Sequence, residues 1–327
     1  MSARPRAAIV GGGVIGGGWA ARFLLNGWDV ALADPAPDAE AKVRTVLAQA
    51  RQALEALHDS SLPPEGTLSL AADVGSAVEG AQWVQESVPE RLDVKHAVLR
   101  TILAHAPGDA VIGSSTSGFT ASELNGFDGA REGNRVIVAH PFNPVYLLPL
   151  VELAGDGALC ARAAETLEAL GMHPLVLRRE IAAHIADRLL ESVWREALWL
   201  VRDGVCTTEE LDDAIRYGFG LRWAQMGLFE TYRIAGGEAG MRHFLHQFGP
   251  ALEWPWSRLT DVPAMDEALV ETIAAQSDRQ SGHMSIRELE RLRDRNLVGI
   301  LKVLRETRTG AGNTVARHEA RLAGSEG

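Results

Sequence analysis

The sequence predicts an α/β fold in which a mostly parallel sheet, with helices on both faces, is followed by an all-helical domain. Two observations lead to this prediction. Short β-rich runs alternate with helical stretches through the first half of the chain, and the strand pattern stops near Arg179. Such alternation is typical of parallel sheets, because a helix carries the chain back between two parallel strands. We expect two domains, residues 1–180 and 181–327, as the length of 327 residues also indicates.

Seven short apolar runs are the expected strands. Each is bounded by glycine, proline or polar residues, which mark the turns at strand ends. In chain order the runs are residues 7–10, 28–33, 68–71, 83–85, 110–113, 136–139 and 175–177. The main helices expected between them are residues 14–25, 39–57, 90–104 and 158–170.

The second half of the chain is expected to contain helices only. An amphipathic stretch over residues 182–202 predicts a long helix. Thr207 is expected to start the next helix, because Glu210 three residues later would complete a capping box. Two more helices are expected over residues 263–277 and 286–305. The tail from Thr309 is rich in glycine, alanine and charge, and we expect it to be frayed.

Composition argues against several classes of protein. No apolar run approaches the roughly 20 residues that a membrane helix needs. Met1 to Arg6 lead almost directly into the first expected strand, so no signal peptide is expected. The two cysteines, Cys160 and Cys206, lie far apart, which favours a reducing cytoplasm over disulfides or a metal site. A formal net charge of −11 argues against nucleic acid or an anionic membrane as the partner.

A glycine-rich loop connects the first expected strand to the first helix. It contains Gly11, Gly13 and Gly16 in the spacing G-x-G-x-x-G, with Val14 and Ile15 inside the motif. In a Rossmann-type fold these glycines allow a tight turn, close approach of a pyrophosphate, and packing of the helix on the strand. Asp34 follows the next strand, where its carboxylate would bind ribose hydroxyls and repel the extra phosphate of NADP. The sequence therefore predicts a Rossmann-like domain that binds NAD.

A histidine and a carboxylate stand near the ends of expected strands. His140 lies just past the run over residues 136–139, at the edge where open α/β sheets bind their ligands. Glu152 lies inside an apolar run, and a carboxylate is costly to bury without a partner. Paired with His140, it would fix the imidazole tautomer and raise its proton affinity. A plainly packed histidine is equally compatible with these residues. Four other histidines in polar contexts are expected to be solvated: His58, His96, His105 and His318.

Together these motifs resemble the 3-hydroxyacyl-CoA dehydrogenase superfamily. The matching segments are residues 11–16, 85–90, 115–117 and 140–144, and Glu152. The resemblance spans nearly the whole chain and implies an NAD-dependent oxidoreductase whose helical second domain forms homodimers. It also implies that His140 and Glu152 are a catalytic pair, and that Ser117 hydrogen-bonds the substrate hydroxyl or ketone. Glu90 and Lys95 match positions near the nicotinamide ribose.

Longer stretches are most similar to the branch of this superfamily that oxidises L-carnitine, which implies carnitine as the small-molecule substrate. They are residues 85–91, 140–152, 222–233, 234–243 and 248–256. Some members of that branch carry an additional thioesterase domain, which this chain is expected to lack. Asp187 stands where the acyl-CoA enzymes have an asparagine. An ionised carboxylate cannot donate a hydrogen bond to a thioester, but it attracts a quaternary ammonium. Asp187 could equally cap its helix or pair with an arginine.

The trimethylammonium group of carnitine requires aromatic faces or carboxylates, because it has no hydrogen-bond donor. Five of the eight tryptophans lie in the helical half: Trp194, Trp199, Trp223, Trp254 and Trp256. Trp223 and Tyr146 are the preferred aromatic candidates, ahead of Phe229 and Tyr232. Arg222 is expected to pair with the substrate carboxylate, and the alternatives are Arg188 and Arg195.

Two other functions stay open at this point. The chain could be another member of the superfamily, acting on a 3-hydroxyacyl-CoA or on L-gulonate. Asp187, the acidic net charge and the tryptophan-rich second half count against a CoA substrate. It could also be a non-catalytic NAD-binding protein, like the lens crystallin of this superfamily. An intact set of Ser117, His140 and Glu152 argues against that function.

Overall fold

The computed structural model describes residues 4–127, 135–235, 244–246, 257, 266–269, 271–272, 275–276 and 283–324. The chain divides into two compact units, one of Met1–Ile185 with Arg293–Gly327 and one of Ala186–Leu292. The first division falls five residues after the expected boundary at 180. Residues from Arg293 onward, which we expected in the helical domain, belong instead to the first unit.

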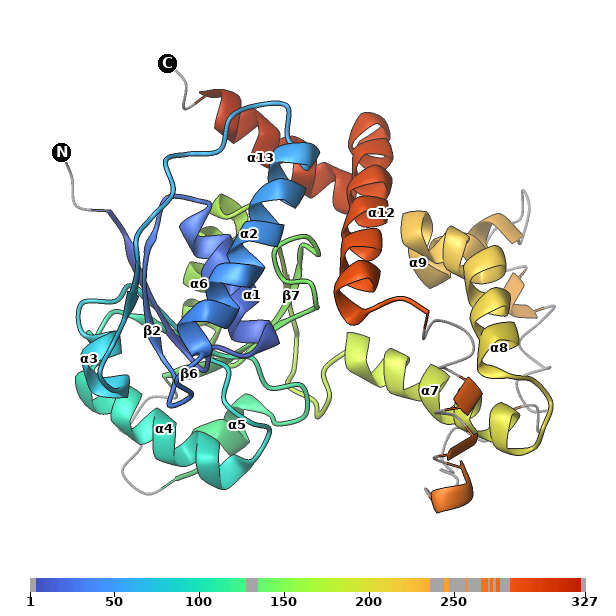
Figure 1. Cartoon of the computed structure of the whole chain (residues 1–327), viewed down its shortest axis with the longest axis horizontal. Coiled ribbons are helices and arrows are strands. Elements are labelled where there is room, and N and C mark those ends of the chain that lie inside the picture. The colour runs from blue at the N-terminus through green and yellow to red at the C-terminus, as the bar shows by residue number, and fades with distance from the viewer. Residues whose placement is uncertain are drawn as a thin grey trace. The chain divides into compact units, whose positions relative to one another are not determined.

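An eight-stranded sheet forms the centre of the first unit, in the order β3-β2-β1-β4-β5-β6-β7-β8 (Figure 1). The strands are β1 (Arg6–Val10), β2 (Asp29–Ala33), β3 (Leu68–Leu70), β4 (Trp83–Glu86), β5 (Val111–Ser114), β6 (Val136–Pro141), β7 (Leu150–Ala154) and β8 (His173–Val176). Neighbouring strands are parallel except for β6 and β7. The α/β fold with a mostly parallel sheet is therefore confirmed. β7 was not predicted, because it follows β6 directly and a strand–helix–strand pattern does not reveal an antiparallel neighbour.

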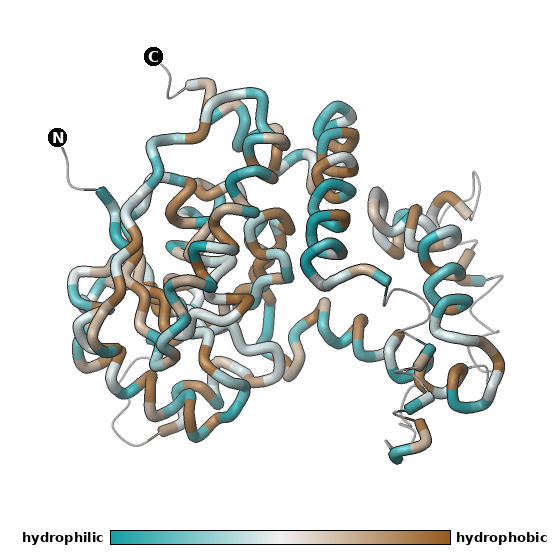
Figure 2. Tube along the Cα trace, in the orientation of Figure 1, coloured by the Kyte–Doolittle hydropathy of each residue, from teal (hydrophilic) through white to brown (hydrophobic). Residues whose placement is uncertain are grey.

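Helices cover both faces of this sheet (Figure 1). They are α1 (Val14–Leu24), α2 (Ala39–Leu57), α3 (Val74–Val78), α4 (Leu92–His105), α5 (Ala121–Leu124), α6 (Gly157–Ala169), α12 (Ile286–Thr307) and α13 (Ala311–Gly324). Alternate residues of β1 point to opposite faces, as in any strand. Ala7 and Ile9 join one hydrophobic core, and Ala8 and Val10 join the other. Figure 2 accordingly shows hydrophobic strands between helices of mixed hydropathy.

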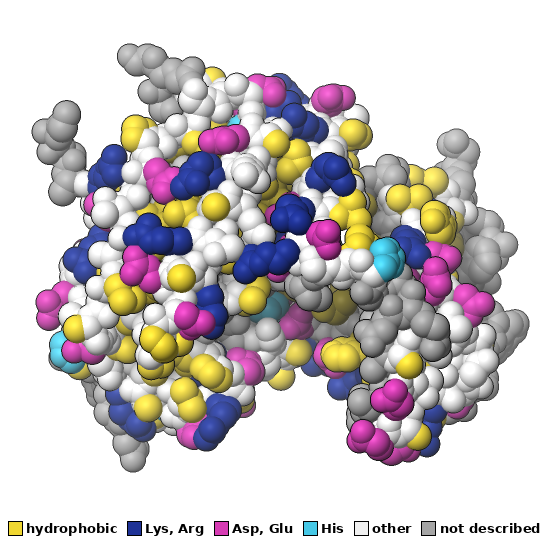
Figure 3. All heavy atoms as spheres, in the orientation of Figure 1, with side chains coloured by type: hydrophobic (Ala, Val, Ile, Leu, Met, Phe, Trp, Pro, Cys, Tyr) yellow, Lys and Arg dark blue, Asp and Glu magenta, His cyan; other side chains and the backbone are white. Residues whose placement is uncertain are grey.

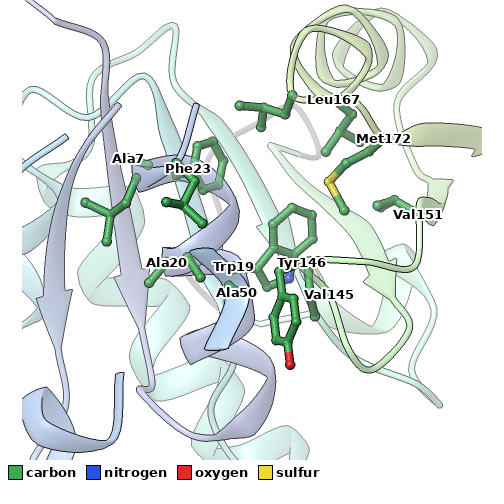
Figure 4. Close-up of a cluster of buried hydrophobic side chains, with 14 of the residues drawn as sticks. Ala7, Trp19, Ala20, Phe23, Ala50, Val145, Tyr146, Val151, Leu167 and Met172 are labelled. Carbon is green, nitrogen blue, oxygen red and sulfur yellow. The ribbon is translucent and has the colours of Figure 1, made fainter. Parts of the chain in front are cut away.

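The larger core lies under α1, α2 and α6 (Figure 4). Its centre is aromatic, with the rings of Trp19 and Phe23 stacked at 6.0 Å and that of Trp83 6.1 Å from Trp19. Val298, Leu301 and Val315, from the two C-terminal helices, belong to the same core. The tail after residue 309 is therefore a packed helix, and the expectation that it frays was wrong. Its high glycine, alanine and charge content hid a buried stripe of apolar residues.

Two histidines that we expected in solvent are buried between α2 and α13. His58 is 7% exposed and His318 5%, and their ring centroids lie 5.0 Å apart. His58 Nδ1 lies 2.8 Å from Glu319 Oε2, and Arg305 pairs with the same carboxylate. Burial lowers the pKa of His318 to about 3. Their polar sequence context predicted exposure because the packing of the C-terminal helix on α2 is not visible locally.

The regular elements described in the second unit are all helices. The helices are α7 (Ala186–Arg202), α8 (Thr208–Ala214), η1 (Ile215–Phe219) and α9 (Gly220–Ala235). Thr207 and Glu210 form the expected capping box at the start of α8. Seven of the fifteen residues of the expected helix over 263–277 lie outside the described residues, as do Trp254 and Trp256. No described helix combines the length and apolar character needed to cross a membrane.

Charges of both signs are interspersed over the face of the first unit shown in Figure 3. Exposed ion pairs of the first unit include Arg44 with Glu40 and Arg51 with Glu65. Exposed pairs of this kind contribute little to stability, typically about 0–1 kcal/mol.

Candidate active site

The candidate site lies at the carboxyl ends of β1, β4, β5 and β6. β1 is the strand where the sheet order reverses, because the chain goes to β2 on one side and later to β4 on the other. Open α/β sheets bind ligands in the crevice at such a switch point. The loop after β1 meets the segment after β4 there, with the Ser87 N–H donating to the Val10 carbonyl.

The glycine loop has the geometry that its spacing predicts. Gly11 has φ +97°, and a side chain there would collide with the Ser87 carbonyl. At Gly16 a Cβ would lie 1.8 Å from the Gly11 carbonyl oxygen, so only glycine lets α1 approach β1 this closely. A Cβ on Gly13 would meet no atom within 4 Å. The loop thus packs tightly against the protein at Gly11 and Gly16, and it has free space at Gly13.

The beginning of α1 offers backbone donors to an anion. Gly13 is the N-cap, no side chain caps the helix, and no acidic residue lies in its first turn. The N–H groups at the start of a helix need partners, and they attract negative charge. Val14 is 64% exposed at this position, so the outer side of the helix start is open to solvent. These features fit a dinucleotide pyrophosphate.

Asp34 follows β2 at the same edge. Its Oδ2 accepts from the Gly12 N–H at 2.6 Å, and its Oδ1 accepts from the Ala36 N–H at 2.7 Å. The carboxylate is therefore fixed beside the glycine loop. This is the place where a Rossmann-type site binds the ribose of NAD.

Ser117, His140 and Glu152 form one hydrogen-bonded chain. Glu152 faces His140 across the antiparallel pair β6–β7, and its Oε2 lies 3.1 Å from His140 Nδ1. The other ring nitrogen, Nε2, lies 3.1 Å from Ser117 Oγ. Because a carboxylate only accepts, we assign the imidazole hydrogen to Nδ1, which leaves the Nε2 lone pair toward Ser117. His140 is 4% exposed and Glu152 fully buried, so the pair is rigid and little screened by water.

A buried ion pair lies at this edge, where Glu86 ends β4. The Lys95 ammonium donates to both oxygens of Glu86, at 3.0 and 3.2 Å, and to the Val88 carbonyl. Ser114 Oγ donates to the same carboxylate at 2.5 Å. Lys95 and Glu86 are 1% and 0% exposed, so the Lys95 side chain is held inside the unit. Its expected place near a nicotinamide ribose stays a prediction. The importance of Glu86 was not recognised from the sequence, although it lies within a segment that resembles the superfamily.

Glu90 holds the segment that carries Ser117. Its Oε1 accepts from Thr116 Oγ1 at 2.5 Å and from the N–H groups of Ser117 and Gly118 at 3.1 and 2.9 Å. Partial burial alone would raise the pKa of Glu90, but these hydrogen bonds and the Lys95 charge lower it. An ionised Glu90 therefore fixes the loop beside His140.

The segment after β8 also enters the site. The Ala183 N–H donates to the Gly118 carbonyl, and the Ile185 N–H donates to Glu152 Oε1 at 2.9 Å. His184 lies between them, 1% exposed, with its ring centroid 5.2 Å from that of His140. His184 was missed from the sequence, because neither spacing nor a strand end marks it. Its proximity to Asp187 in the chain was the only signal.

The expected substrate-binding residues are divided between the two units. Tyr146 is buried in the larger core beside Trp19 and Val145 (Figure 4). Its hydroxyl donates to Asp294 at 2.5 Å, so this ring is the weaker aromatic candidate. Trp223 lies on α9 of the second unit, 39% exposed and against Phe219 at 4.6 Å. The remaining candidates also lie in the second unit: Asp187 in the first turn of α7, and Arg222 on α9.

Two protein-family models cover most of the chain. Residues 6–181 match the NAD-binding domain of 3-hydroxyacyl-CoA dehydrogenase, and residues 184–272 match the C-terminal domain of the same enzyme. The chain belongs to the 3-hydroxyacyl-CoA dehydrogenase family. Within this family, its glycine loop lies in the domain that binds NAD, so the predictions of NAD and of a Rossmann-like domain are confirmed.

Two curated relatives are similar to this chain over most of its length. An L-carnitine dehydrogenase/betainyl-CoA thioesterase of Ruegeria pomeroyi is 61% identical over 97% of this chain and 65% of its own length. An L-carnitine dehydrogenase of Mesorhizobium japonicum is 54% identical over 95% of this chain and 86% of its own length. The chain thus spans slightly less than two thirds of the larger relative and most of the smaller one.

Solved structures support the fold. The chain matches a 5-formyl-3-hydroxy-2-methylpyridine 4-carboxylic acid 5-dehydrogenase, described as an NAD+-dependent dismutase, with a TM-score of 0.77. That protein is 30% identical, and the match covers 92% of this chain and 99% of the other. The same architecture therefore occurs in a protein whose name states a different substrate.

Proposed function

We propose that this chain oxidises the C3 hydroxyl of L-carnitine to the ketone 3-dehydrocarnitine, with NAD as the hydride acceptor. The observation that carries the reaction type is the hydrogen-bonded chain of Ser117, His140 and Glu152, in the sheet whose first strand leads into the glycine loop. The substrate is supported by relatives named L-carnitine dehydrogenase at 47–61% identity.

In this proposal His140 is the general base. Its Nε2 takes the proton from the C3 hydroxyl, and Glu152 at Nδ1 stabilises the imidazolium that forms. Ser117 Oγ hydrogen-bonds the substrate oxygen and holds it in line with Nε2. General base catalysis of this kind contributes about 10²–10⁴-fold to the rate. NAD, when bound, supplies the nicotinamide ring that takes up the hydride from C3.

The cofactor would be held by the loop and by the acid after β2. The backbone of Gly11 to Gly16, with the donors of Val14 and Ile15, would bind the pyrophosphate at the start of α1. Asp34 would accept hydrogen bonds from the ribose hydroxyls. We further propose that Glu90 and Lys95 shape the nicotinamide end of the site, since Glu90 fixes the Ser117 segment.

The two ends of carnitine call for opposite charges. We propose that Asp187 and Trp223 bind the trimethylammonium group, through charge and through an aromatic face. Arg222 would pair with the substrate carboxylate. The test is single replacement of each residue, which should raise the KM for L-carnitine and leave the KM for NAD unchanged.

We also propose that the chain forms homodimers in the cytoplasm. Helix α7 exposes Leu189, Leu190 and Trp194 at 59%, 57% and 58% in a single chain, and apolar side chains gathered on one helix favour a protein partner. Both cysteines are free, which suits a reducing compartment. Light scattering coupled to size exclusion would give twice the mass of the chain, and a monomeric mass would contradict the proposal.

The function is tested by following NADH formation by absorbance. The purified chain is given NAD with L-carnitine, D-carnitine, L-3-hydroxybutyryl-CoA or L-gulonate in turn, at mildly alkaline pH. Turnover of L-carnitine alone supports the proposal. Turnover of the CoA ester alone would reject carnitine and leave the role of His140 intact. NAD binding without turnover of any of these compounds would indicate a non-catalytic protein.

A further inference from the structure

Three consecutive residues after β8 each bind a different part of the candidate site. The Ala183 N–H donates to the Gly118 carbonyl, just past Ser117. His184 Nε2 lies 3.1 Å from the Thr116 carbonyl oxygen, just before Ser117. The next N–H, that of Ile185, donates to Glu152 Oε1. The segment therefore binds the residues before and after Ser117, and it also binds Glu152.

His184 is the member of this segment whose side chain takes part. Its ring is 1% exposed and lies against the ring of His140, with centroids 5.2 Å apart and planes tilted by 46°. Ala183 and His184 both have positive φ, 59° and 48°, which residues with a Cβ adopt rarely and at a cost. Two such residues in succession turn the chain so that the imidazole enters the site.

The contact with Thr116 determines which ring nitrogen of His184 carries the hydrogen. A carbonyl oxygen only accepts, so His184 Nε2 must carry a hydrogen and donate it. A neutral imidazole with its hydrogen on Nε2 meets this requirement. Neutrality also suits the neighbour, because His140 becomes positive when it takes a proton, and a second positive ring at this distance would oppose that charge.

We propose that His184 is a positioning residue of the active site, which holds the Thr116 carbonyl and packs against His140 so that Ser117 and His140 stay aligned on the substrate oxygen. This inference rests on the roles proposed above for Ser117 and His140. Glu90 binds the Ser117 segment through its N–H groups, and His184 binds it through a carbonyl. Loss of either leaves the segment held from one side only, and small displacements of a reacting hydroxyl reduce turnover strongly.

The experiment compares two replacements of His184 with one control. His184→Phe keeps the ring volume and removes the donor, while His184→Gln keeps a donor that reaches as far along the side chain as Nε2. Both place a Cβ-bearing residue at the same positive φ, so backbone strain is matched. His96→Phe is the control, because His96 Nε2 also lies 2.8 Å from a backbone carbonyl, that of Glu123, on an exposed part of α4.

Kinetics on L-carnitine are the first readout. We expect His184→Phe to lower kcat about 10-fold, the size of one hydrogen bond, with the KM for NAD unchanged. His184→Gln should recover most of that loss, and His96→Phe should match the wild type. Unchanged kcat in His184→Phe, no recovery in His184→Gln, or a parallel loss of NAD binding would each overturn the proposal.

A second readout needs no substrate and so separates this inference from the proposed function. The ¹⁵N signals of the His140 ring are compared between wild type and variants with NAD bound. We expect a shift in His184→Phe, a return toward the wild-type signal in His184→Gln, and none in His96→Phe. If the wild type oxidises none of the test compounds, the proposed function fails, while identical His140 signals in all proteins would overturn the role of His184.

Discussion

His140 and Glu152 face each other because they occupy opposite positions of β6 and β7. Side chains opposite each other in an antiparallel pair lie on the same face and in contact. A slip of one residue in this register would send one of the two to the other face of the sheet. The geometry of the proposed base is therefore set by strand pairing, and the surrounding loops add Ser117.

At this scale the first prediction concerns the base itself. His140→Ala should lower kcat on the true substrate at least 100-fold, because it removes the group that takes the proton. NAD affinity, measured by fluorescence titration, should stay close to the wild-type value, since the residues proposed to hold the pyrophosphate and ribose are the glycine loop and Asp34. The exposed His105 provides a matched control as His105→Ala. Loss of NAD binding together with activity would show that His140 supports the fold instead.

A second prediction contrasts two glycines of the same loop. Gly16→Ala places a Cβ 1.8 Å from a carbonyl oxygen, so the loop or α1 must move. We expect a loss of about 1–3 kcal/mol in the free energy of unfolding, with weaker NAD binding. Gly13→Ala meets no protein atom within 4 Å. It should leave the Tm unchanged and weaken NAD binding alone, and a fall in its Tm would show that the open side of the loop is misassigned.

Individual residues were predictable where their position in the chain implied their place in space. Gly11, Gly16 and Asp34 follow strands with a known spacing, and His140 stands at a strand end. His184 could not be found in this way, because its position depends on two positive φ angles in an irregular segment. Tyr146 was predicted as part of a cation site from its residue type, and residue type alone does not distinguish a ligand-facing ring from a core ring.

At the scale of elements, α12 is tied to the loop that follows the proposed base. Tyr146 lies in the connection between β6 and β7, and its hydroxyl is bound by Asp294 and approached by Arg293 of α12, at 2.5 and 3.3 Å. Burial and the Asp294 carboxylate raise the pKa of Tyr146, so the phenol stays protonated and donates at any physiological pH. This contact joins α12 to the connection that follows the proposed base.

The third prediction tests this contact. Tyr146→Phe removes the donor and leaves the buried Asp294 carboxylate with fewer partners, which should cost about 1–3 kcal/mol of stability. The KM for L-carnitine should not change, because the ring remains in the core. Tyr217→Phe, on a side chain that is 77% exposed, should alter neither quantity. A raised KM at unchanged stability would restore Tyr146 to the substrate site.

The elements themselves were largely predictable, and the two exceptions have different causes. The seven expected strands are confirmed with ends shifted by no more than two residues, because each is a short apolar run bounded by turn residues. β7 is an antiparallel return, and α13 is a polar-looking helix whose apolar stripe packs on a distant surface. β7 was missed because no helix separates it from β6, and α13 was missed because the surface on which it packs is distant in sequence.

At the scale of the whole molecule, the contact between α2 and α13 makes stability depend on pH. The pKa of His318 is lowered to about 3 by burial, from an ordinary value of 6.5. Between these values the unfolded chain binds a proton that the folded chain does not, so stability is complete above pH 6.5 and is lost as the pH falls toward 3. Burial lowers the pKa of His58 too, although Glu319 opposes the shift.

The fourth prediction follows from this loss of stability at low pH. The free energy of unfolding should fall by up to about 1.4 kcal/mol per pH unit for His318 as the pH drops below 6. His318→Phe should flatten that dependence, measured by urea unfolding from pH 7.5 to 5, and His105→Phe, at an exposed position, should not. A variant of His318 with the wild-type pH dependence would place the titrating group elsewhere.

The first unit is completed by the last residues of the chain. Val298, Leu301 and Val315 belong to the same core as Ala7 and Ile9, and the whole helical unit is encoded between them. On the ribosome, the sheet is therefore synthesised early and must wait for the second unit to be translated before its core can close. Until then the part of this core that α12 and α13 cover stays exposed, although α1, α2 and α6 are already present, and the nascent chain depends on the second unit being completed quickly or on chaperones that shield this part.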